Sequence, residues 1–208
     1  MQYLLIAAVG YLLGCIPSGL IVGKQFCGID IREHGSKNMG TTNMFRTLGA
    51  KPAFFVLIAD MAKGMLAVTF ADYLLANDAN ALLLGGIMSI IGHNYPVFLG
   101  FKGGRGVATG LGVILVLMPK VTAVVFSVWA IIVFLTRYVS LGSVTAATLV
   151  PVFAWYFTYP WQYFYFSVVA ALFIVIRHKD NIIRLLNSTE SKIKQGNAKD
   201  LKNDGEQK

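Results

Sequence analysis

The sequence has few charged residues. Asp, Glu, Lys and Arg make up 13% of the 208 residues and apolar residues 56%, whereas soluble domains carry about 25% charged residues. This composition excludes an ordinary soluble domain and is typical of a membrane protein. Acidic residues are the scarcest, at 10 against 18 basic ones. The resulting excess of positive charge could indicate binding to nucleic acid or to an anionic membrane surface. The placement of the charges has to decide between these two partners.

Cysteine and histidine are also scarce. Cys15 and Cys27 do not form a C-x-x-C pair, and no two of the three histidines have the spacing of a zinc site. We therefore predict no metal site and no cofactor. The N-terminal stretch 1–22 lacks a basic n-region and an A-x-A cleavage site, which predicts a retained membrane span rather than a signal peptide.

Long apolar stretches are abundant. About seven of them approach the length needed to cross roughly 30 Å of hydrocarbon. They lie near residues 1–22, 54–75, 81–98, 107–119, 121–136, 143–159 and 161–177. Because they lack two-residue alternation, we expect an all-α polytopic membrane bundle of about seven helices rather than a barrel. Only Met118-Pro119-Lys120 separates two of the stretches, which predicts a tight helical hairpin and leaves a bundle of about five spans as the alternative.

The basic residues lie on one side of the predicted bundle. With an odd number of spans, this side holds every Lys and Arg except Lys63 and Lys120. By the positive-inside rule it is the cytoplasm, so the N-terminus lies outside and the C-terminus inside. Topology thus explains the positive charge, and we predict no nucleic-acid partner. We expect one membrane-embedded domain over 1–190 and a disordered cytoplasmic tail over the polar, Lys-rich residues 191–208.

The first predicted cytoplasmic connection, between Gly28 and Gly49, is rich in groups that bind phosphate. Glycines let backbone N–H groups converge on an anion, neutral side chains add donors, and a guanidinium adds a bidentate cation. The candidates are Gly35, Ser36, Asn38, Thr42, Asn43 and Arg46. For this loop alone, a flexible linker with ordinary basic-inside charges is the alternative.

The second cytoplasmic connection carries a Gly-Gly-Arg-Gly turn directly before an apolar stretch. No G-x-x-x-x-G-K-[ST] frame fits it, so it is not a Walker A loop. Unpaired N–H groups of Gly103 and Gly104 at a helix start would still favour a phosphoryl group, and Lys102 and Arg105 add positive charge. The alternative is a glycine-rich re-entrant turn with basic residues at the helix end.

Two shorter segments add candidates. The connection after residue 136 holds Arg137, Ser140 and Ser143, and Arg137 could bind phosphate or anchor its helix at the membrane interface. After the last apolar stretch, His178 and Asn181 share one face if the segment is helical, as does Arg184.

Two opposite charges lie inside the second apolar stretch. Asp60 and Lys63 are spaced i, i+3 and would be costly in lipid if unpaired. We expect an ion pair that stabilises the first cytoplasmic loop, with a direct catalytic role as the alternative.

Five blocks occur in a fixed order at predicted cytoplasmic positions. They are G-S-K-N-M-G-T-T-N with R-T-L-G after it, D-M-A-K-G, G-H-N-Y-P-V-F-L-G-F-K-G-G-R-G-V-A-T, T-R-Y-V-S-L-G-S and H-K-D-N-I-I-R-L-L-N-S-T-E. With these blocks almost the whole chain resembles the bacterial acyl-phosphate:glycerol-3-phosphate acyltransferase (PlsY) family. The resemblance implies an enzyme of the bacterial inner membrane whose active site faces the cytoplasm. Such an enzyme moves a fatty acyl group from acyl phosphate to the 1-hydroxyl of glycerol 3-phosphate, forming lysophosphatidic acid in the first committed step of phospholipid synthesis.

The resemblance also implies roles for single residues. The catalytic positions would be Ser36, Arg46, Arg105, Ser143, His178 and Asn181. The substrate-binding positions would be Gly35, Asn38, Thr42, Asn43, Lys102, Gly103, Gly104, Arg137 and Ser140. Beyond the two substrates and membrane lipid, no obligate protein partner is expected.

The sequence departs from the family pattern at two positions. Arg105 stands where the family usually has Lys, which keeps the charge but changes its reach and geometry. Ser188 stands where the family usually has Gly. The H-x-x-x-x-D signature of acyl-CoA-dependent glycerol-phosphate acyltransferases is absent, and the general base could be His178 or a phosphate oxygen of the substrate.

Two other classes of protein remain as alternatives. An organophosphate transporter or channel also uses basic, glycine-rich helix breaks, but it would place polar groups near the midplane and often shows inverted repeats. The polar blocks cluster on one predicted face instead, and no repeat is evident. A non-catalytic scaffold subunit is the third option.

Overall fold

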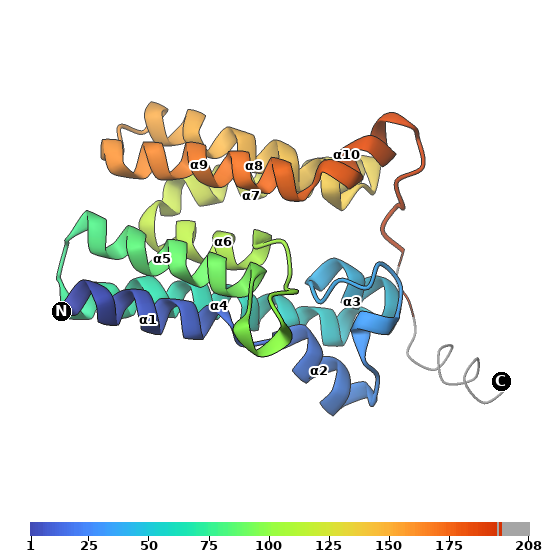
Figure 1. Ribbon diagram of the computed structural model, residues 1–208. Coiled ribbons are helices and arrows are strands. Elements are labelled where there is room, and N and C mark those ends of the chain that lie inside the picture. Colours follow the sequence, from blue (N-terminus) through green and yellow to red (C-terminus); the bar gives the residue numbers. More distant parts are fainter. Residues whose placement is uncertain (195, 197–208) are drawn as a thin grey trace, which may run out of the picture.

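Every regular element among the described residues, 1–194 and 196, is helical in the computed structural model (Figure 1). The elements are α1 (Gln2–Gly14), α2 (Ser18–Cys27), η1 (Ile31–Glu33), α3 (Thr41–Leu48), α4 (Ala50–Leu74), α5 (Ala79–Asn94), η2 (Val97–Leu99), α6 (Val107–Leu117), α7 (Pro119–Thr136), α8 (Val139–Tyr156), α9 (Trp161–Arg177) and α10 (Lys179–Leu186). The predicted all-α class is therefore confirmed.

Each predicted apolar stretch is largely helical. Five segments are long and apolar enough to cross a membrane: Gln2–Cys27, Ala50–Leu74, Ala79–Leu99, Pro119–Thr136 and Val139–Tyr156. The other two, α6 and α9, are apolar but shorter, at 11 and 17 residues.

We expected one continuous helix over 1–22, but the first apolar stretch is broken into two helices. α1 ends at Gly14 and α2 begins at Ser18, with Pro17 at the break. A proline has no N–H to donate to the carbonyl four residues earlier, and its ring clashes with that carbonyl, so a helix breaks before it. The ammonium of Lys63 donates to the carbonyl of Ile16 at 3.1 Å and so stabilises the break.

The predicted tight connection around Met118-Pro119-Lys120 is present, but its two helices separate and pack on different neighbours. Met118 alone separates α6 from α7, but α6 packs mainly on α4 whereas α7 packs mainly on α8. Pro119 is the first residue of α7, a position where its missing N–H costs nothing. The chain therefore leaves one group of helices and joins another at this junction.

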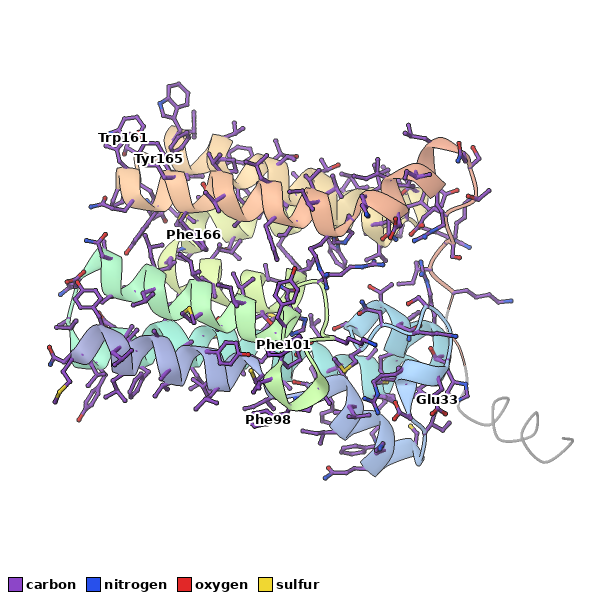
Figure 2. The ribbon with its side chains drawn as sticks, in the orientation of Figure 1. Glu33, Phe98, Phe101, Trp161, Tyr165 and Phe166 are labelled. Carbon is purple, nitrogen blue, oxygen red and sulfur yellow. The ribbon has the colours of Figure 1, made fainter. Side chains whose placement is uncertain are left out.

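The helices form two layers (Figure 1). One contains α1, α4, α5 and α6, and the other α7, α8 and α9. α10 lies at the same end of the molecule as α2 and α3. At the opposite end, Trp161 and Tyr165 project outward, whereas Phe166 points between the layers (Figure 2).

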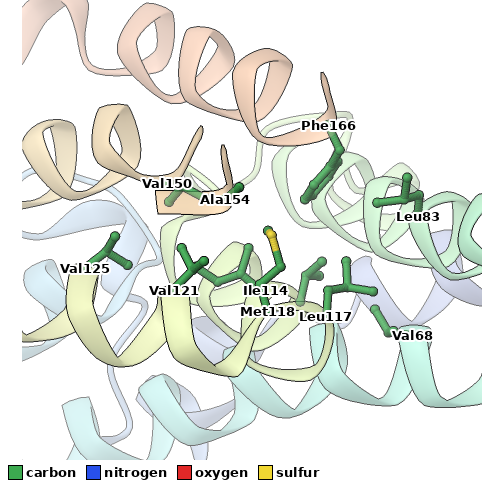
Figure 3. Packing of buried hydrophobic residues seen from close by; sticks show 11 residues of the cluster. Val68, Leu83, Ile114, Leu117, Met118, Val121, Val125, Val150, Ala154 and Phe166 are labelled. Atoms are coloured by element: carbon green, nitrogen blue, oxygen red, sulfur yellow. The ribbon is translucent and has the colours of Figure 1, made fainter. Parts of the chain in front are cut away.

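A buried apolar cluster joins the layers at the end where Phe166 lies. It combines residues from α4 to α9, among them Val68, Leu83, Leu117, Val150 and Phe166 (Figure 3). Met118, at the junction of α6 and α7, lies inside this cluster and is fully buried. The cluster thus closes one end of the space between the layers.

Candidate active site

A cavity of about 1000 Å³ lies between the two layers. Toward Phe166 its walls are apolar, with Leu111, Ile114, Val150 and Ala170 among the lining residues. Toward α3 and α10 the walls are polar. Residues lining this polar end include Ser36, Thr42, Arg46, Arg105, Ser140, Ser143, His178, Asn181, Arg184 and Glu190.

Asn43 shapes the first loop. Its side chain is buried; Oδ1 accepts from the N–H of Ser36 at 2.8 Å, and Nδ2 donates to the carbonyls of Asn38 at 2.8 Å and His34 at 3.1 Å. Gly35 has a φ of +57°, and a Cβ there would lie 2.4 Å from Oδ1 of Asn43. Asn43 lines the cavity as predicted for a binding residue, but its hydrogen bonds hold the loop that presents Ser36.

Arg46 reaches the cavity from α3. One of its guanidinium nitrogens donates to the carbonyl of Ser191, while the buried Nε has no hydrogen-bond partner among the described residues. Burial lowers the pKa of Arg46 from its usual value. An arginine with an unused donor in a polar cavity is suited to bind an oxyanion.

The glycine turn differs from its prediction. The N–H groups of Gly103 and Gly104 are not unpaired: they donate to the carbonyls of Asn94 at 3.1 Å and His93 at 3.0 Å. Neither glycine lines the cavity, and Lys102 is exposed outside it. The turn instead brings Arg105 to the cavity wall, where burial and the nearby charge of Arg184 lower the pKa of Arg105.

Glu190 organises the opposite wall and was not selected from the sequence. Its carboxylate accepts from the hydroxyl of Ser140 at 2.9 Å, from Nδ2 of Asn181 at 2.7 Å and from Nε of Arg184 at 2.8 Å. Burial raises the pKa of Glu190, but these hydrogen bonds outweigh burial and keep it below its usual value. The T-E pair at the end of the last sequence block contained this residue, although nothing in the block identified its partners.

His178 lies at the junction of α9 and α10. Its Nδ1 is 2.8 Å from the carbonyl of Ile174, and because a carbonyl only accepts, Nδ1 carries the proton and Nε2 has the lone pair. Burial lowers the pKa of His178 to about 4. The imidazole is therefore neutral at pH 7 and can accept a hydrogen bond.

The predicted Asp60–Lys63 ion pair is confirmed. Nζ of Lys63 lies 2.8 Å from Oδ1 of Asp60, and Nδ1 of His93 lies 3.5 Å from the same oxygen. These contacts lie outside hydrogen-bond geometry, so Oδ1 of Asp60 has the Lys63 ammonium beside it but no hydrogen bond in the described chain. The pair holds α4 against the α1–α2 break through the bond from Lys63 to Ile16.

Most of the predicted residues meet at the polar end of the cavity. Besides Asn43, Arg46 and Arg105, the lining includes Gly35, Ser36, Asn38, Thr42, Ser140, Ser143, His178 and Asn181. Arg137 does not line it; its φ is +63°, and its carbonyl accepts from the N–H of Ile193 at 2.7 Å.

The described part of the predicted tail is not separate from the bundle. Ile193 and Gly196 donate backbone hydrogen bonds to Arg137 and to Phe45 at 2.7 and 3.0 Å. The rest of the tail, residues 195 and 197–208, for which we predicted disorder, lies outside the described residues.

Together, the fold and site define a class of protein: a helical membrane protein with a large cavity that has an arginine-rich end and an apolar end, suited to an amphipathic phosphate compound. A family model described as glycerol-3-phosphate acyltransferase matches residues 4–188. The chain belongs to this family, and it is therefore an acyltransferase and an integral membrane protein.

Individual relatives agree with this assignment. A glycerol-3-phosphate acyltransferase of Fusobacterium nucleatum is 44% identical over 93% of this chain and 100% of its own length. Glycerol-3-phosphate acyltransferase 2 of Moorella thermoacetica is 44% identical over 92% of this chain and 98% of its own length.

Two solved structures have the same fold. The glycerol 3-phosphate form of PlsY, an integral membrane glycerol 3-phosphate acyltransferase, superposes with a TM-score of 0.88 at 39% identity, covering 93% of this chain and 96% of that one. The lysophosphatidic acid form of PlsY gives a TM-score of 0.86 at 38% identity, covering 92% and 95%.

Proposed function

We propose that the protein transfers a fatty acyl group from acyl phosphate to the 1-hydroxyl of glycerol 3-phosphate and forms lysophosphatidic acid. The observation that carries this proposal is the cavity with one arginine-rich and one apolar end. Phosphate groups fit the guanidinium groups of Arg46 and Arg105. The acyl chain fits the apolar walls between the layers, because burying it there removes apolar surface from lipid headgroups and water.

The donor is an activated acyl group, so the protein chiefly has to orient the two substrates and neutralise the phosphate charge. The glycerol hydroxyl oxygen attacks the acyl carbonyl carbon, the new ester C–O bond forms, and the bond from that carbon to the phosphate oxygen breaks. Inorganic phosphate leaves. Arginines that hold the phosphate neutralise the charge that grows on it.

The proton of the attacking hydroxyl goes to a phosphate oxygen of the substrate in this mechanism. His178, with a pKa of about 4, is a weak base, because an efficient general base has a pKa near the working pH. Its Nε2 lone pair can still accept a hydrogen bond from the hydroxyl and fix its direction. Ser143, which is buried in the cavity wall, can donate to an oxygen of either substrate.

The test is a product assay with purified protein in detergent and in lipid. We expect lysophosphatidic acid from glycerol 3-phosphate with acyl phosphate, and little or none with acyl-CoA. An Asn181→Ala variant serves as the control for contaminating activity. If no detergent or lipid condition gives lysophosphatidic acid with acyl phosphate, the proposed reaction is wrong.

We also propose that the protein resides in the bacterial inner membrane with its polar cavity end facing the cytoplasm. The basic residues of the loops around α3 and α10 support this orientation. A C-terminal reporter that is fluorescent only in the cytoplasm should fluoresce, and an alkaline phosphatase fusion at the same position should be inactive. The reverse pattern would place the site on the outer face.

A further inference from the structure

Arg177 makes a contact that the proposed mechanism does not use. It is the last residue of α9 and directly precedes His178. One of its guanidinium nitrogens donates to the carbonyl of Gly104 at 2.6 Å, and the group lies 5.4 Å from the centre of the Tyr95 ring. The contact joins the layer of α7, α8 and α9 to the loop that follows α5. Arg177 does not line the cavity.

Gly104 is held on its other sides as well. Its N–H donates to the carbonyl of His93 at 3.0 Å. A Cβ on Gly104 would lie 2.0 Å from Nε2 of His93, so the imidazole packs directly against the glycine. The bond from Arg177 to the carbonyl therefore fixes the remaining polar group of this residue.

The next residue, Arg105, lacks such support. Among the described residues it has no hydrogen bond, although burial and the charges of Arg184, Arg177 and Arg46 act on it. Its guanidinium lines the cavity. Because no side chain holds this guanidinium, its position depends on the backbone of the glycine turn.

We propose that Arg177 is a positioning residue for Arg105. By holding the Gly104 carbonyl, Arg177 fixes the turn and so directs the Arg105 guanidinium to the phosphate of a substrate. Because Arg177 directly precedes His178, the same contact also fixes the position of Arg105 on one layer relative to His178 on the other. This inference rests on the proposed function, in which Arg105 binds a substrate phosphate.

A double-mutant cycle tests the inference, because a residue that acts through Arg105 has nothing to position once Arg105 is removed. Arg177→Gln should lower kcat/KM for one phosphate substrate roughly tenfold or more, the scale of losing one hydrogen bond to a charged group. Arg177→Gln should raise the KM for the same substrate whose KM is raised by Arg105→Ala. In the Arg105→Ala background, Arg177→Gln should cost less than about threefold. Arg177→Lys should restore part of the loss.

Two controls separate this role from others. Lys179→Gln removes an exposed charge close to Arg177 that does not line the cavity, and it should leave kcat/KM unchanged. Melting temperatures in detergent identify any variant that fails to fold. If Arg177→Gln fails to fold, Arg177→Lys replaces it in the double-mutant cycle. An equal fold-loss from Arg177→Gln with and without Arg105 would overturn the inference, because a general charge or folding effect acts in both backgrounds. A wild-type protein without activity would instead contradict the proposed function.

Discussion

Arg105 stands out among the single residues because it brings a charge to the cavity without a hydrogen-bonded partner in the described chain. Arg105→Ala should lower kcat/KM by roughly 10- to 100-fold, since a hydrogen bond to a charged group contributes about 1.5–3 kcal/mol. Arg105→Lys keeps the charge and should stay within about tenfold of the wild type. Steady-state rates with each substrate varied in turn would measure both. An equal loss in the two variants would contradict a charge-based role.

His178 gives a prediction for the pH dependence of stability. Its pKa is about 4 in the folded protein against 6.5 for the free side chain. Between these values the unfolded chain binds a proton that the folded chain does not, so the free energy of unfolding falls as the pH is lowered from 6.5 to 4. The loss reaches roughly 3 kcal/mol at most.

Melting temperatures in detergent at pH 4 to 7, for the wild type and His178→Asn, would measure this effect. The variant should lose less stability on acidification than the wild type does. Above pH 6.5 the two curves should run parallel. Parallel curves over the whole range would show that His178 does not titrate as described.

At the residue scale, the sequence predicted most of the residues that line the cavity but not what each one contacts. Ser36, Arg46, Ser143, His178 and Asn181 meet at the cavity although they come from segments far apart in the sequence. Glu190 and Arg177 were missed partly because each has a hydrogen-bond partner far away in the sequence, Ser140 at 50 positions and Gly104 at 73, and a local pattern does not specify such pairs.

At the scale of helices, glycines set the distance between α4 and α6. A Cβ on Gly112 would lie 2.1 Å from the carbonyl oxygen of Met61, and one on Gly64 would lie 2.3 Å from that of Thr109. Such close backbone contact is how helices associate in membranes, where lipid removes the hydrophobic drive between them.

Gly112→Ala should therefore push α6 away from α4 and lower the melting temperature by several degrees, as about 1–3 kcal/mol of overpacking does. Gly110 on the same helix is the matched control, because its Cβ would have only Ile90 nearby, at 3.8 Å. Gly110→Ala should change the melting temperature little. Similar losses in both variants would mean that helix propensity or insertion, rather than the α4 contact, decides the outcome.

The positions of the helices followed from apolar runs, but two junctions did not. Pro17 breaks the first run because it lacks an N–H. The proline is visible in the sequence, but the prediction of this span used apolar content alone. At the second junction the sequence placed the new stretch from residue 121, whereas α7 begins at Pro119. It did not indicate that α7 would leave α6 and pack on α8, because the direction of a new helix depends on the surface it finds.

For the whole molecule, the cavity between the layers has a closed apolar end and a polar end. The buried cluster around Met118 and Phe166 joins the layers at one end. At the other, they are connected by the bond from Arg177 to Gly104 and by the segment after Glu190, whose Ser191 and Gly196 contact α3. A long apolar substrate would thus have its head held between these connections and its tail directed to Phe166.

Phe166 should then limit the length of the acyl chain. It is 7% exposed, lines the cavity and belongs to the buried cluster; along α9 it lies about 17 Å from Arg177 at 1.5 Å per residue. Phe166→Ala should lengthen the cavity and shift the preferred acyl phosphate to longer chains. Ala170→Phe, which fills the cavity nearer the polar end, should shift it to shorter ones.

Competition between acyl phosphates of graded length, read as the ratio of lysophosphatidic acid products, would measure both shifts. Leu172→Ala on the same helix is the control, because Leu172 is 59% exposed and does not line the cavity. Its product ratio should match that of the wild type. Opposite shifts from Phe166→Ala and Ala170→Phe are the result that the two-ended cavity requires, because one change adds space at the closed end and the other removes space along the same path. A shift in the same direction from both would mean that the chain follows another route, between the helices and into the lipid.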